Sequence, residues 1–206
     1  MSAFTWPSDA SPAGHDRQQA DGQIQAAVLV PLFIAGETPE PHVVLTKRRA
    51  DLRRHAGEIS FPGGRKDADD PDLSATALRE AEEEIGLNRT QVSLLGPLPT
   101  TSTFATNYVI HPFVATIPAG TAWTLSAKEV DEVLELPLEE VRAAKTVTNI
   151  ERRGITFQTD AYIVGDNVIW GATARILAHL FEALLPPDAE GNLALKSAPV
   201  SATNKP

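Results

Sequence analysis

Apolar residues occur along this chain in short runs, separated by turns rich in Gly, Pro, Asn and Asp. A β-branched apolar run at 24–34 predicts a buried strand, and the turn at 36–41 predicts a hairpin to a second strand at 42–46. Further strands are predicted at 58–61, 92–98, 108–117, 130–136, 155–164 and 168–170, the last two joined as a hairpin across Gly165-Asp166-Asn167.

Helical periodicity is clearest in the middle of the chain. An apolar stripe is formed there by Leu73, Ala77, Leu78, Ala81 and Ile85. Asp70 is predicted as the N-cap, with Pro71 at the first helical position. Gly86 is suited to the left-handed residue that ends a helix. A short helix is predicted at 137–142 and a C-terminal one at 173–185.

The order of these elements is strands, a helix, more strands and a terminal helix, which is not a regular strand–helix alternation. It predicts an α/β fold with a mixed sheet and helices on both faces. Residues 1–22 are polar and lack apolar periodicity, so we expect a mobile N-terminal arm. One domain is expected at 23–185, followed by a flexible tail at 186–206.

Composition narrows the classes of function. The chain has 206 residues, a net charge of −9 and no cysteine, which excludes disulfides, zinc–thiolate sites and cysteine nucleophiles. An acidic protein is a poor candidate for nucleic-acid binding. The first residues lack the pattern of a signal peptide, and the longest apolar run, 26–35, is too short to span a bilayer. We therefore expect a cytoplasmic protein without a membrane partner.

The candidate chemistry lies in four carboxylates at the end of the predicted central helix. At about 100° per residue, Glu80, Glu83 and Glu84 share one side of the helix, while Glu82 points away. Like charges one turn apart repel, and acids near a helix C-terminus oppose its dipole. A solvated acidic face is one interpretation. A bound cation is the other, and carboxylate oxygens suit Mg²⁺ or Mn²⁺.

The segment from Arg79 to Leu87, with Gly63-Gly64 upstream, resembles the Nudix box, G-x5-E-x7-R-E-U-x-E-E-x-G-U, where U is aliphatic. The second half matches position by position. The first half departs, because the segment between Gly64 and Arg79 is one residue longer than the pattern. The expected first Glu falls on Pro71 or Asp70, depending on the end from which it is counted, and Asp70 could partly substitute for it.

A second segment, Leu45 to Gly64, resembles the signature of the coenzyme A pyrophosphatase branch of that family, L-L-T-x-R-(S/A)-x3-R-x3-G-x3-F-P-G-G. Arg48, Arg53, Gly57 and the Phe61-Pro62-Gly63-Gly64 turn fall on its positions. The additional residue between Gly64 and Arg79 is also typical of this branch. The resemblance covers residues 24–185.

The resemblance implies an α/β/α sandwich with the box on a loop–helix–loop, and hydrolysis of a diphosphate with Mg²⁺ or Mn²⁺. It implies metal binding by Glu80, Glu84, Glu83 and the Gly64 carbonyl. Glu83 is a third ligand or the base that takes the proton of water, and Arg79 orients a box carboxylate. Glu129 and Glu132 are candidates for a base outside the box. The residues expected to bind substrate are Arg48, Arg53, Phe61 and Gly63.

For coenzyme A the implied products are 3′,5′-ADP and 4′-phosphopantetheine, and Arg48 and Arg53 could recognise the additional 3′-phosphate because arginine forks bind phosphate bidentately. Two alternatives stay open. The substrate could be ADP-ribose, a dinucleotide or a nucleoside triphosphate, or the protein could be a non-catalytic ligand sensor with this fold. A homodimer is compatible with the sequence.

Overall fold

The computed structural model describes residues 22–35, 40–51, 57–103, 107–152, 154–185 and 194–196. The expected N-terminal arm lies outside this part of the chain, apart from Gly22. The expected tail also lies outside it, apart from residues 194–196, which return to the end of the C-terminal helix, where the Leu185 amide donates to the Ala194 carbonyl at 2.9 Å.

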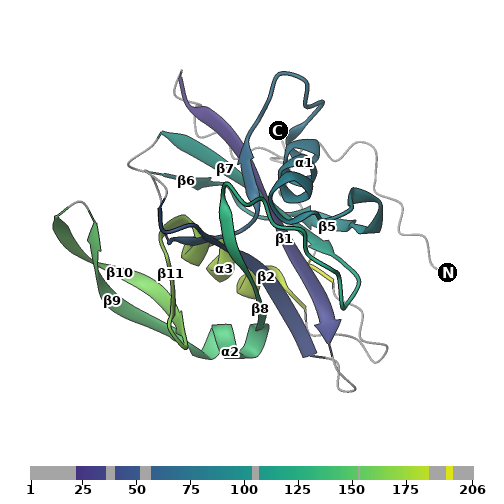
Figure 1. The fold of residues 1–206 in the computed structure, drawn as a ribbon. Helices are drawn as coiled ribbons and strands as arrows, with labels where there is room; N and C mark the ends of the chain where they lie inside the picture. The colour runs from purple at the N-terminus through teal and green to yellow at the C-terminus, as the bar shows by residue number, and fades with distance from the viewer. Residues whose placement is uncertain are drawn as a thin grey trace, which may run out of the picture.

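The strands follow the predicted order with three additions (Figure 1). They are β1 (Ile24–Ala35), β2 (Glu40–Arg48), β3 (Ile59–Ser60), β4 (Gly63–Arg65), β5 (Ser93–Pro97), β6 (Thr101–Ser102), β7 (Tyr108–Thr116), β8 (Val130–Pro137), β9 (Lys145–Arg152), β10 (Ile155–Val164) and β11 (Asn167–Trp170). Strands β4, β6 and β9 have no counterpart among the predicted elements.

The helices are α1 (Leu73–Ile85), α2 (Leu138–Ala143) and α3 (Gly171–Ala183), and a 3-10 turn, η1 (Arg89–Gln91), follows α1. The prediction of Asp70 as the N-cap of α1 is wrong. The cap is Asp72, whose side chain accepts a hydrogen bond from the Ala75 amide at 2.8 Å. Gly86 ends α1 with a φ of 70°, as predicted.

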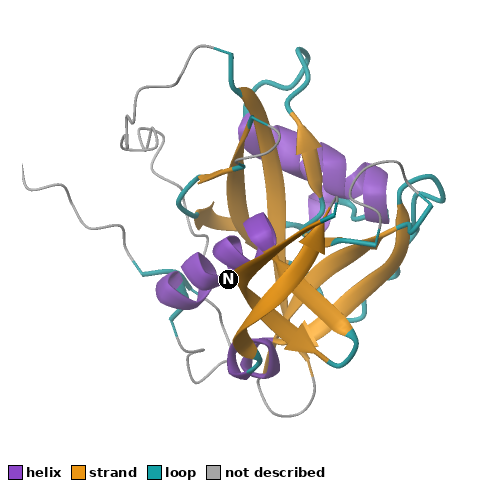
Figure 2. Cartoon of the chain, turned by 90° about the vertical axis from the view of Figure 1, so that its left-hand side faces the viewer, coloured by secondary structure: helices purple, strands orange, loops and turns teal. Residues whose placement is uncertain are grey.

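Within the described chain, eight strands form one mixed sheet, in which β3, β2, β1, β7 and β5 follow one another. The pairing of β1 with β7 is parallel, and β1 also pairs antiparallel with β2 at one end and β4 at the other. The central strand therefore borders the glycine turn directly. Strands account for more of the described chain than helices do (Figure 2).

Alternating residues of β1 supply two apolar cores. Ala27, Leu29 and Phe33 pack with the buried face of α1, which presents Ala77, Ala81 and Ile85. Val30 and Leu32 face the other way, into a core completed by α2 and α3. The predicted mixed sheet with helices on both faces is confirmed.

A second sheet is formed by β9, β10 and β11 in the order β11-β10-β9. It packs on α3 through Tyr162 and Ile169, both buried in the same core as α3. The β9–β10 hairpin extends away from the main sheet (Figure 1). No helix in the described residues is long and apolar enough to cross a membrane.

Candidate functional site

The turn between β3 and β4 places a backbone amide against the box helix. A Cβ on Gly63 would lie 2.3 Å from the Ala27 carbonyl oxygen, so only glycine fits beside the central strand. In this position the Gly63 amide donates to Glu84 Oε2 at 3.1 Å. The glycine turn and α1 are therefore joined by the carboxylate of Glu84.

Gly64 makes room for the second carboxylate. A Cβ at this residue would lie 2.4 Å from the carboxyl carbon of Glu80 and 2.5 Å from each of its oxygens. The Glu80 carboxylate thus lies directly over the β4 backbone. Both Glu80 and Glu84 project from α1 towards the same two glycines, as their shared side of the helix predicts.

Burial sets the electrostatics of these two acids. The side chain of Glu84 is 5% exposed and that of Glu80 is 18% exposed. Loss of hydration disfavours the charged form, and it raises the pKa of Glu84 from 4.5 to about 7. Burial also raises the pKa of Glu80, against the opposing effect of the Arg79 guanidinium.

Arg48, at the end of β2, contacts Glu84 and a third carboxylate, that of Glu129. Its Nη1 lies 3.4 Å from Glu84 Oε1, and its Nη2 lies 3.5 Å from Glu129 Oε2. The Arg48 Nε is buried and has no hydrogen-bond partner. The guanidinium is therefore a cation between two carboxylates with part of its hydrogen-bonding capacity unused.

Glu129 is brought to the site by a short loop before β8. The loop is fixed at both ends, because the Ser126 amide donates to the Glu84 carbonyl at 2.9 Å and the Arg49 amide donates to the Glu129 carbonyl at 3.0 Å. The charge of Glu129 contributes to the raised pKa of Glu80 and of Glu84. Glu132, the other outside candidate, is exposed on β8 and is paired in register with Lys47.

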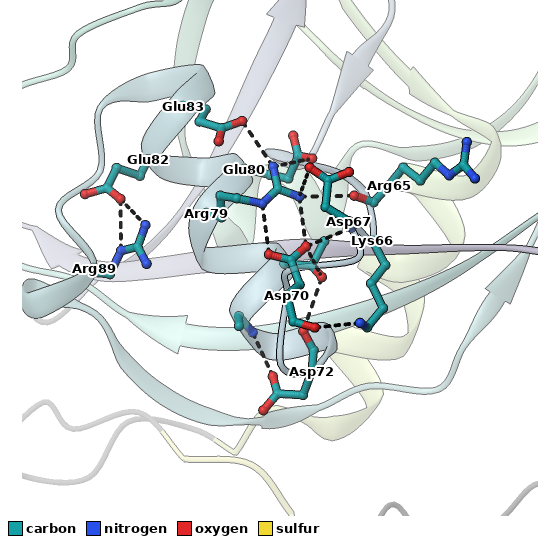
Figure 3. A network of polar contacts seen from close by, with 12 residues as sticks. Arg65, Lys66, Asp67, Asp70, Asp72, Arg79, Glu80, Glu82, Glu83 and Arg89 are labelled. Carbon is teal, nitrogen blue, oxygen red and sulfur yellow. Dashed lines mark hydrogen bonds and ion pairs between the residues drawn. The ribbon is translucent and has the colours of Figure 1, made fainter.

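Arg79 holds the box together through Asp70 (Figure 3). Its Nε donates to Asp70 Oδ1 and its Nη2 to Asp70 Oδ2, each at 3.0 Å. Asp70 also accepts from the Thr76 hydroxyl and the Asp67 amide, both at 2.9 Å. The Arg79 guanidinium holds the pKa of Asp70 well below its usual range. Asp70 thus fixes the loop before α1 instead of capping the helix.

Arg79 also donates to the Arg65 carbonyl at 3.1 Å, and its other contacts include the box carboxylates. Its Nη1 lies 3.0 Å from Glu80 Oε1 and 3.1 Å from Glu83 Oε2. Glu83 is otherwise exposed, at the rim of the site. Glu82 turns away and pairs with Arg89, on the other side of α1 (Figure 3).

The donor set suits a hard divalent cation. Glu84 supplies a buried carboxylate and Glu80 a half-buried one next to the Gly63-Gly64 backbone. A cation would offset the cost of burying these negative charges, which their raised pKa values reflect. Within the described chain, no three acidic or histidine side chains already converge as a complete metal site. Part of the ligand set would therefore come from backbone, water or substrate oxygens.

The residues predicted to bind substrate lie in different places. Phe61 is 2% exposed and belongs to the apolar core that α2 and α3 complete, so it anchors the glycine turn to that core. Gly63 and Arg48 lie at the site, whereas Arg53 lies outside the described residues. The network that Asp67 and Asp70 form around Arg79 could not be predicted from the sequence. The one signal for it is that Asp70 occupies an expected position of the first box carboxylate.

Comparisons with known proteins give matches in both sequence and structure. The family described as NUDIX domain matches residues 23–156. A Yersinia pestis (strain Pestoides F) protein named Uncharacterized Nudix hydrolase NudL is 38% identical over 158 residues, which cover 76% of this chain and 77% of the relative. A Yersinia pseudotuberculosis (serotype O:1b, strain IP 31758) protein of the same name matches with the same identity and coverage.

Among solved structures, the crystal structure of a MutT/nudix family protein from Enterococcus faecalis superposes with a TM-score of 0.54. The match covers 79% of this chain and 62% of that one, with 15% sequence identity. At that identity the likeness concerns the fold alone.

Proposed function

The chain belongs to the Nudix family, and we propose that it is a metal-dependent diphosphatase that splits coenzyme A, or a derivative of it, into 3′,5′-ADP and 4′-phosphopantetheine. Its α/β/α sandwich is the Nudix fold, and as a Nudix hydrolase it acts on phosphorus anhydrides. The observation that carries the proposal is the placement of Glu80 and Glu84 against the Gly63-Gly64 turn, beside Arg48.

Glu80, Glu84 and the Gly64 carbonyl would hold the divalent metal ion, Mg²⁺ or Mn²⁺, that Nudix hydrolases generally use. When bound, such an ion neutralises charge on the phosphate oxygens and lowers the pKa of water. The protein keeps both carboxylates in place through the Gly63 amide and the Arg79 guanidinium. Arg79 acts on the ligands and not on the substrate.

A base near the attacking water would take up its proton. Glu83 lies on the same side of α1 and could serve as this base or as a third ligand. Glu129 is the second candidate, because it reaches the site from outside the box and shares Arg48 with Glu84. Of the two, Glu129 is the one whose charge acts on both Glu80 and Glu84.

Arg48 is the substrate-binding residue that the geometry supports most directly. Its Nη atoms reach Glu84 and Glu129, so a diphosphate bound at those carboxylates would lie within reach of the same guanidinium. This geometry favours the diphosphate itself as the group that Arg48 contacts. Recognition of the 3′-phosphate then depends on Arg53 and its neighbours.

The choice of coenzyme A rests on the Arg48-to-Gly64 segment, and the similarity to proteins named NudL agrees with that branch of the family. A cytoplasmic location is part of the same proposal.

Hydrolysis of coenzyme A and of dephospho-coenzyme A by the wild type and by Arg53→Ala tests the substrate. We expect Arg53→Ala to lower kcat/KM for coenzyme A by roughly tenfold more than for dephospho-coenzyme A, since one charged hydrogen bond is lost only with the former. Arg48→Ala should slow both substrates alike. An equal effect of Arg53→Ala on both substrates would argue against recognition of the 3′-phosphate.

A further inference from the structure

The β9–β10 hairpin gathers most of the exposed large apolar side chains of the described chain. Of six such residues, four lie on it: Val147, Ile155, Phe157 and Ile163. Ile155 is 67% exposed and Phe157 is 37% exposed. Exposed apolar groups concentrated on one element of a soluble fold commonly mark a binding surface.

The strand register places most of these groups on one face. Residues directly opposite in an antiparallel pair share a face, and Phe157 is opposite Ile150 while Ala161 is opposite Trp170. We call Ile150, Ile155, Phe157 and Trp170 the hairpin apolar face. Tyr162, one residue on from Ala161, points to the other side, into the core under α3.

Aromatic contacts order the hairpin apolar face. The rings of Phe157 and Trp170 meet edge to face with centroids 5.9 Å apart. The Arg152 guanidinium lies over the Trp170 ring, 5.3 Å from its centroid, and also pairs with Glu58 at 3.1 Å. Because this cation is matched by a carboxylate, the face suits a neutral apolar ligand better than a phosphate.

Glu58 connects the hairpin apolar face to the candidate site. The Thr46 and Ser60 hydroxyls lie 3.3 Å apart, so these paired residues of β2 and β3 share a face of the main sheet. Two residues further along β2, the Arg48 amide donates at 3.0 Å to the carbonyl of Glu58, the residue just before β3, so the pairing continues by one residue pair. By strand alternation the side chains of Arg48 and Glu58 lie on that same face. The hairpin apolar face thus adjoins the side of the sheet where Arg48 meets Glu84.

We propose that the hairpin apolar face binds the acyl chain of a coenzyme A thioester, so that this surface favours acylated over free coenzyme A. The inference rests on the proposed function and extends it. With the diphosphate at Glu80 and Glu84, the pantetheine arm would run past Arg48 and Glu58, and its thioester end would reach Phe157 and Ile155. Two features favour an acyl chain over a second protein as the occupant. The hairpin apolar face adjoins the candidate site, and the charge of Arg152 beside it is neutralised by Glu58.

The test compares kcat/KM for octanoyl-coenzyme A and for free coenzyme A, with Mg²⁺, in the wild type and in Phe157→Ser and Ile155→Ser. Val147→Ser is the matched control, because Val147 is 56% exposed on the same hairpin but is paired with Asp160, on the opposite face. We expect each face variant to lower the ratio of the two constants by roughly tenfold, a loss of about 1.4 kcal/mol, with free coenzyme A changed by less than about twofold. Val147→Ser should keep the wild-type ratio.

An unchanged ratio in both face variants, with free coenzyme A still hydrolysed, would overturn this inference and leave the proposed function standing. Hydrolysis of neither substrate would overturn both. The molar mass in solution provides a separate outcome. A wild-type dimer that Phe157→Ser and Ile155→Ser convert to monomers would show that a second copy covers the face, and it would overturn the assignment to an acyl chain. Ile155→Ser is the variant less prone to a folding defect, because the Ile155 side chain is the most exposed of the four large apolar side chains on the hairpin.

Discussion

Replacing Glu84 by Gln is expected to stabilise the metal-free protein at alkaline pH while removing its response to metal. Burial raises the pKa of Glu84 from 4.5 to about 7 in the folded state. The folded protein therefore keeps a proton on Glu84 at a pH where the unfolded chain has lost it. Its stability falls as the pH rises through this interval.

The magnitude follows from that difference in pKa. One pKa unit corresponds to about 1.4 kcal/mol, so the ionised, buried carboxylate costs the folded state up to about 3 kcal/mol above neutral pH. Gln is neutral and nearly isosteric, and its side-chain oxygen can still accept from the Gly63 amide. Glu84→Gln should therefore unfold with a free energy up to about 3 kcal/mol larger than wild type at about pH 8.5, and with little difference at about pH 5.

Urea unfolding in EDTA at both pH values, repeated with excess Mg²⁺ or Mn²⁺, measures both effects. A ligand present at a hundred times its Kd stabilises the folded state by about 2.7 kcal/mol, and we expect this gain in the wild type but not in Glu84→Gln. Because metal competes with the proton on Glu84, wild-type metal affinity should rise as the pH increases through about 7. A variant that is equally destabilised at both pH values, or that keeps the full metal-dependent gain, would refute the reasoning.

Three further variants test other parts of the site. Gly64→Ala should reduce Mn²⁺ affinity, followed by calorimetric titration, by roughly tenfold or more, because the added Cβ displaces the Glu80 carboxylate; unchanged affinity would contradict its position over β4. Asp70→Asn should lower the free energy of unfolding by roughly 2 kcal/mol, because it weakens the charge-assisted bonds to Arg79. Its control, Glu82→Gln, removes only the exposed pair with Arg89 and should cost less than about 1 kcal/mol, so equal losses would speak against the Asp70 network. Glu129→Gln should lower kcat by roughly a hundredfold if Glu129 takes the proton of water, whereas Glu132→Gln should not; a fall in Glu83→Gln alone would assign the base to Glu83.

The parts of the fold that the sequence predicts are those whose signal is local. The apolar run of β1 and the stripe of Ala77, Ala81 and Ile85 predict their elements and their buried faces, because the periodicity reports burial directly. Strand β9 lacks such a signal, since Val147 and Ile150 lie on opposite faces and the strand depends on its pairing with β10. Strand β4 begins with two glycines and forms because β1 offers it a partner.

The candidate site also has parts that follow from local sequence and parts that depend on tertiary contacts. The carboxylates Glu80 and Glu84 can be placed together from helical spacing alone. The N-cap is harder to predict, because Pro71 makes Asp70 the apparent cap in the local sequence, whereas the tertiary pairing of Asp70 with Arg79 leaves Asp72 to cap the helix. Likewise, Arg48 and Glu129 are distant in sequence, and they meet because Arg48 is paired in register with Val130, the residue after Glu129.

The most direct test of the central claim is hydrolysis of coenzyme A, ADP-ribose and NADH, measured side by side with Mg²⁺ and with Mn²⁺ and with the products identified. We expect the highest kcat/KM for coenzyme A, release of 3′,5′-ADP and 4′-phosphopantetheine, and loss of the reaction in EDTA and in Glu84→Gln. Cleavage of ADP-ribose or NADH with coenzyme A left intact would contradict the assignment of coenzyme A as the substrate.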